Sequence, residues 1–146
     1  MGKTTIFIRR RDGRIEVRLN DYGRTFVRDL LTHLMDVETQ ADHPWRSATN
    51  QPIDPASDAD DPLWVLERER MTSSHAELAL MTVDDEFLTD AEAWAWLCAL
   101  QNVLRGVSSE RGFFSDTDVE RASDDALSDV RLIQLLLFEL AEVVTA

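Results

Sequence analysis

The chain has 146 residues, of which 44% are apolar and 29% are charged, and its formal net charge is −13. This length suits one domain with a core of ordinary size, and the negative charge argues against general binding to nucleic acid or to an anionic membrane, because phosphates would be repelled. The charge is also segregated: residues 1–28 carry eight basic against three acidic side chains, whereas the other 118 residues carry seven basic against 25 acidic ones.

The first predicted element is a β-hairpin over residues 4–19. Residues 14–19 alternate between charged and apolar side chains, which predicts a strand with one buried face. Ile6 and Ile8 are expected to supply the buried face of the partner strand, and Gly13 is expected to close the turn. Because a lone hairpin is marginally stable in water, its apolar face must pack on helices.

Two helical regions and a loop follow the hairpin. Apolar residues at three- and four-residue spacing predict a helix over residues 22–38. Residues 39–61 contain three of the four prolines among small polar and acidic residues, which predicts a long mobile loop. A broken helix is expected over residues 62–81.

The two remaining helices are predicted near the C-terminal end. Thr89 and Glu92 have the spacing of a capping box, which predicts a helix over residues 90–107. Residues 124–144 are apolar on more than one face, so this helix is expected to be the most buried. The fold class is therefore predicted to be α+β, a single domain over residues 1–146 with an N-terminal hairpin packed on a bundle of about four main helices.

Cysteine content and hydropathy bear on the compartment. Cys98 is the single cysteine, so no internal disulfide can form, which is typical of a reducing interior. No stretch approaches the roughly twenty apolar residues that a membrane helix needs. We therefore expect a cytoplasmic protein that does not bind membranes.

Several segments resemble a known family. Asp61-Pro62-Leu63 begins a predicted helix, and Ala95-Trp96-Leu97 precedes Ala99-Leu100-Gln101-Asn102; the hairpin contributes Phe7, Arg9, Arg10, Gly13, Ile15, Val17 and Leu19. Over nearly the whole chain this resembles the uncharacterised actinobacterial family called domain of unknown function two-zero-one-seven. Members are often encoded beside the ClpS adaptor, so the resemblance implies a shared fold and a link to Clp-type proteolysis, but no activity.

Two groups of residues are candidates for binding a protein partner. Trp94 and Trp96 are two residues apart, about 200° around a helix, so we expect one in the core and the other against the C-terminal helix, the loop or a partner. The alternative is that both tryptophans pack between helices. The hairpin arginines are expected on an outward face and an edge strand, where they either bind an acidic partner or a second copy, or only protect the edge from aggregation. These arginines are Arg9, Arg11, Arg14 and Arg18.

The leading functional hypothesis is a non-enzymatic protein-interaction or regulatory module, because no catalytic set, phosphate loop or zinc-ligand pair is present. It would bind a protein partner or itself, without nucleic acid, cofactor or metal. One alternative is a metal-dependent enzyme that uses the acidic clusters at residues 58–61 and 84–86, although such clusters more often cap helices. The other alternative is an acidic mimic of nucleic acid.

Overall fold

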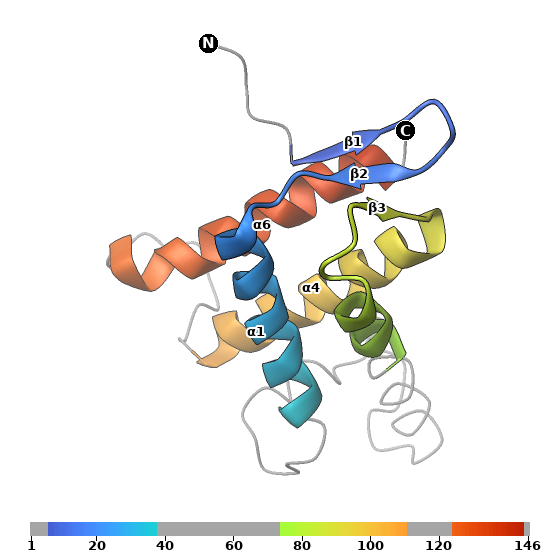
Figure 1. Ribbon diagram of the computed structural model, residues 1–146. Helices are drawn as coiled ribbons and strands as arrows, with labels where there is room; N and C mark the ends of the chain where they lie inside the picture. Colours follow the sequence, from blue (N-terminus) through green and yellow to red (C-terminus); the bar gives the residue numbers. More distant parts are fainter. Residues whose placement is uncertain (1–5, 38–73, 111–123, 145–146) are drawn as a thin grey trace, which may run out of the picture.

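The computed structural model describes residues 6–37, 74–110 and 124–144, and it has the predicted α+β fold (Figure 1). A short antiparallel sheet contacts helices α4 and α6, and α1 contacts α4. A further helix covers residues 74–81. The elements are β1 (Phe7–Arg9), β2 (Ile15–Val17), α1 (Asp21–Val37), β3 (Phe87–Leu88), α4 (Asp90–Glu110) and α6 (Asp124–Val144).

The sheet has the strand order β1-β2-β3, and its third strand was not predicted. The hairpin turn forms as expected, with Gly13 at a φ of 91°, a conformation that side chains with a Cβ rarely adopt. β3 joins the free side of β2, where Leu88 lies opposite Ile15. A two-residue strand is too short to show an alternating pattern in a sequence, which explains why it was missed.

The predicted buried face of β1 is wrong by one residue. Phe7 pairs with Val17, and Ile8 pairs with Glu16. Cross-strand partners lie on the same face of a sheet, so Phe7 is buried while Ile8 shares the outer face with Glu16. A shift of one residue in register exchanges the two faces of a strand, and the apolar run at residues 6–8 does not reveal which register forms.

Trp96 occupies the centre of the core, between the sheet and the helix at 74–81. Its side chain is fully buried and meets the ring of Phe7 edge to face, with the ring centroids 6.2 Å apart. Its Nε1–H donates to Oγ1 of Thr82 over 2.8 Å, and that hydroxyl donates to backbone carbonyls of the preceding helical turn. The indole therefore fills the core without leaving a polar group unpaired.

Arg24 joins the hairpin to α1 and to the segment before β3. Its guanidinium donates to the carbonyls of Val17, Leu19, Val83 and Asp85, at 2.8–3.2 Å. A cation in the first turn of a helix is disfavoured by the helix dipole. Here the four carbonyl oxygens compensate for that cost, so this arginine fixes the point where the sheet meets the helical layer.

The helix bounds agree closely with the predictions, and the capping box is confirmed. The Thr89 amide donates to Oε1 of Glu92 over 2.8 Å, and the Glu92 amide donates to Oγ1 of Thr89 over 3.2 Å. The predicted loop at 39–61 and the first part of the broken helix, 62–73, lie outside the described residues.

The expectation that the last helix is the most buried is wrong. α6 presents one apolar stripe to α4 and β1, which includes Ile133, Leu136 and Leu140. Leu135 and Phe138 remain 43% and 56% exposed. The helix carries more apolar residues than its contacts with those two elements can cover.

Replacing Trp96 with phenylalanine should lower the free energy of unfolding by about 1–3 kcal/mol, because it leaves a cavity and removes the donor to Thr82. Trp94→Phe is the matched control, since Trp94 is half exposed on the same helix, and it should cost about 0.5 kcal/mol or less. Urea unfolding followed by circular dichroism measures both values. Equal losses would contradict the assignment of Trp96 to the core.

Replacing Arg24 with lysine should cost about 2 kcal/mol, because an ammonium group keeps the charge but cannot reach four carbonyls in a planar fork. The same urea titration on Arg105→Lys, an exposed arginine of α4, provides the control and should show almost no change. If Arg24→Lys left the free energy of unfolding unchanged, the four hydrogen bonds would not be what holds the sheet to the helices.

Candidate protein-binding surface

The register of the hairpin gathers arginines on the side of the sheet that faces away from the core. Phe7, Ile15, Val17 and Leu88 point inward, so their alternating neighbours point outward. We call this outer side the arginine face. It consists of Ile8, Arg10, Arg14, Glu16, Arg18 and Phe87, with Arg11 and Asp12 in the turn at its end.

Glu16 lies at the centre of the arginine face and holds two guanidinium groups. Nη2 of Arg10 is 2.6 Å from Oε2 of Glu16, and Nε of Arg18 is 3.1 Å from the same oxygen. The two arginines cover the carboxylate, whose side chain is 14% exposed while theirs are 44% and 51% exposed. The hydrogen bond from Arg10, together with the one from Arg18, holds the pKa of Glu16 below its ordinary value.

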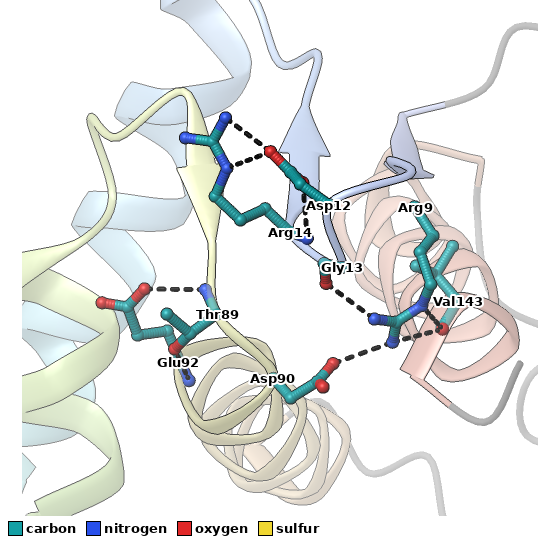
Figure 2. A network of polar contacts seen from close by, with 8 residues as sticks. All are labelled: Arg9, Asp12, Gly13, Arg14, Thr89, Asp90, Glu92 and Val143. Carbon is teal, nitrogen blue, oxygen red and sulfur yellow. Dashed lines mark hydrogen bonds and ion pairs between the residues drawn. The ribbon is translucent and has the colours of Figure 1, made fainter.

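Arg14 is fixed at the other end of the face, next to the turn (Figure 2). Its Nε donates to Oδ2 of Asp12 over 2.8 Å, and its backbone amide donates to Oδ1 over 3.0 Å. These bonds, the backbone one first, lower the pKa of Asp12. The guanidinium also lies 4.1 Å from the centre of the Phe87 ring, a cation–π contact. Among the described residues, Arg11 has no ion-pair partner and extends from the turn as an exposed cation.

Arg9 does not belong to this surface, and its predicted outward position is wrong. It lies opposite Ile15 on the inner face and reaches the ends of two helices (Figure 2). It donates to the carbonyl of Val143 over 3.0 Å, to the carbonyl of Gly13 over 2.8 Å, and to Oδ1 of Asp90 over 2.8 Å. Since the last turn of α6 contains no basic residue, Arg9 supplies the positive charge that a helix C-terminus favours.

The two tryptophans separate as their spacing predicts. Trp96 is fully buried, so its candidate role as a direct partner contact is corrected to a core role. Trp94 is 51% exposed, but it lies on α4 rather than on the outer side of the sheet. The structure therefore groups Arg11, Arg14 and Arg18 and separates them from both tryptophans.

Sequence reasoning missed Arg10 and Phe87 as members of the surface, whereas the alternation over residues 14–19 already placed Glu16 on the charged face. The pairing of Arg10 with Arg14 could have been found by centring the turn on Asp12, in the middle of residues 11–13, which brings these two residues opposite each other. Phe87 gave no usable signal because β3 itself was not predicted.

The acidic clusters do not assemble into a metal site in the described ranges. Asp84 pairs with Arg28, and the neighbouring acidic side chains are exposed. Within residues 6–37, 74–110 and 124–144, no group of three or more potential ligands is placed to hold a metal ion. The cluster at 58–61 lies outside those ranges.

Comparison of the chain with models of protein families, with curated proteins and with solved structures found no match. The resemblance to the actinobacterial family therefore stays a prediction.

As for membranes, none of the helices in the described segments combines the length and the apolar character needed to cross a bilayer.

The carboxyl group of Glu16 should titrate below its ordinary value of 4.5 in an NMR pH titration, because both arginines stabilise its charged form. Since the pKa is lowered on folding, these contacts favour the folded state above the unfolded pKa, and this contribution is lost as the pH falls through the folded value. Arg10→Gln should move the midpoint upward, whereas Arg105→Gln should not. An unchanged midpoint in Arg10→Gln would contradict the described geometry.

Proposed function

We propose that the protein is a non-enzymatic interaction or regulatory module that binds a protein partner through the arginine face. The observation that carries this proposal is the concentration of four exposed arginines against two carboxylates on one side of a small sheet, in a chain whose net charge is −13. Arginine and aromatic residues are enriched at the energetic centres of protein interfaces, and this face also contains Phe87.

The placement of the arginines lowers the stability of the folded protein, so stability does not explain it. Arg10 and Arg14 lie directly opposite each other where the turn closes, and like charges in that position are destabilising. Asp12 and Glu16 offset part of this repulsion. An outer face that only had to be polar could alternate charges across the strands, so the retained pair supports a role in binding.

Protection of the sheet edge is a weaker explanation, because α6 already covers the edge strand. Phe7, backbone included, is 1% exposed, and the amide of Ile6 donates to Oε1 of the buried Glu139 on α6 over 3.4 Å. A partner strand therefore cannot add to β1 at Phe7. Binding on this side of the molecule would use the outward side chains, not the backbone edge.

The link to Clp-type proteolysis is part of the proposal only through the family resemblance. No contact or charge in the described residues favours a Clp component over another partner. Likewise, no contact or charge in the described residues favours either alternative function, a metal-dependent enzyme or an acidic mimic of nucleic acid.

Affinity capture from a lysate of the source cells, read by quantitative mass spectrometry, tests the proposal. Wild-type protein should capture at least one protein that the double variant Arg10→Gln/Arg18→Gln loses by tenfold or more. The double variant Arg105→Gln/Arg131→Gln changes two exposed arginines on the helices and should retain it. Capture that is unaffected by the first variant would reject the arginine face, and the absence of any reproducible partner would reject the proposal.

A further inference from the structure

We infer that the arginine face recognises carboxylate side chains of a short, extended acidic protein segment, rather than a second folded copy of this chain. This inference rests on the proposed function and names the class of partner. It follows from three properties of the face: how the guanidinium groups are held, how large the face is, and how far its charge reaches.

Glu16 orients two guanidinium groups while using few of their donors. Arg10 and Arg18 each place one nitrogen on Oε2 of Glu16, and a guanidinium has five N–H donors. Both groups remain about half exposed, so most donors face solvent in an orientation that is already fixed. Fixed, planar donor groups suit carboxylates, which accept two parallel hydrogen bonds from arginine.

The size of the face favours an extended segment over a folded domain. Arg14 and Arg18 are four residues apart along the direction of β2, so the face is about 13 Å long. Three strands spaced about 4.8 Å apart add a width of roughly 10–15 Å. The resulting area is on the order of 200 Å², well below the roughly 800 Å² per partner of a stable interface between folded proteins. About five extended residues would cover the same length.

The pattern of side chains on the face indicates where the carboxylates would lie. Alternate residues of an extended segment point to one side at about 6.8 Å intervals, so acidic residues at alternate positions could reach the arginines at both ends of β2. At the middle of the face, Ile8 and Phe87 lie on either side of Glu16, and both side chains are only partly buried. The expected ligand therefore has alternating acidic residues, with room for an apolar side chain near its middle.

The range of the electrostatic attraction argues for a short ligand. Charges at physiological ionic strength are screened over about 8 Å, so a short segment on the face is attracted mainly by its local arginines. A long polyanion, or a second copy with a net charge of −13, would extend over the acidic remainder of the molecule and be repelled there. An acidic protein segment is thus favoured over nucleic acid.

Fluorescence anisotropy with full-length protein provides the test. The probe is a fluorescein-labelled ten-residue peptide of alternating glutamate and serine, and the comparison probes are a glutamine–serine peptide and a ten-nucleotide oligothymidylate. We expect the glutamate peptide to bind, and Arg10→Gln and Arg18→Gln each to weaken binding by about tenfold, because each removes hydrogen bonds to a charged group. Arg105→Gln should stay within about twofold of wild type, and circular dichroism should show all three variants folded.

Several results would overturn the inference. These are no binding at 1 mM glutamate peptide, equal binding of the glutamine peptide, tighter binding of oligothymidylate, and equal weakening by Arg105→Gln. A dimer in sedimentation experiments that dissociates in Arg10→Gln would instead identify a second copy as the occupant. If a cellular partner is lost with the arginine-face variant but the peptide does not bind, the proposed function stands and this inference fails. If the peptide binds through the arginines but no cellular partner is found, the inference about carboxylate recognition stands and the proposed function fails.

Discussion

The register of the N-terminal hairpin is the constraint on which both the core and the proposed binding surface depend. Pairing Phe7 with Val17 places the Phe7 ring against Trp96, and the same pairing turns Arg10, Glu16 and Arg18 to the outside. A slip of one residue would move the aromatic ring to solvent and bring charges to the core. The positive φ of Gly13 in the turn and the guanidinium of Arg24 at the far end hold that register from both sides.

The arginines of this region perform different tasks, although they are chemically identical. Arg24 and Arg9 donate hydrogen bonds to backbone carbonyls at places where elements meet, so they act as internal crosslinks. Arg10, Arg14 and Arg18 pair with carboxylates at the surface and stay largely accessible. The excess of positive charge near the beginning of the chain therefore has two origins. One is structural and the other is available for recognition.

Sequence patterns revealed the features that depend on local spacing and failed for those that depend on pairing. The helices, the turn at Gly13 and the capping box of Thr89 and Glu92 follow from short-range rules, and the structure confirms them. The third strand, with Phe87, forms only when distant segments meet, so no window along the chain contains its cause. The inward position of Arg9 follows from the register of the hairpin, which places Arg9 opposite Ile15 and which the apolar run at residues 6–8 does not reveal.

The contact between β1 and the end of α6 affects the order in which the protein can form. Arg9 and Val143 are separated by 134 positions, and the amide of Ile6 reaches Glu139 over a similar distance along the chain. Closing such a long loop delays the contact relative to local helices and turns. During synthesis on the ribosome, the hairpin emerges before α6, and its inner side cannot be fully covered until α6 has followed. Until then the apolar side chain of Phe7 is exposed and prone to aggregation, and such surfaces are the ones that chaperones bind.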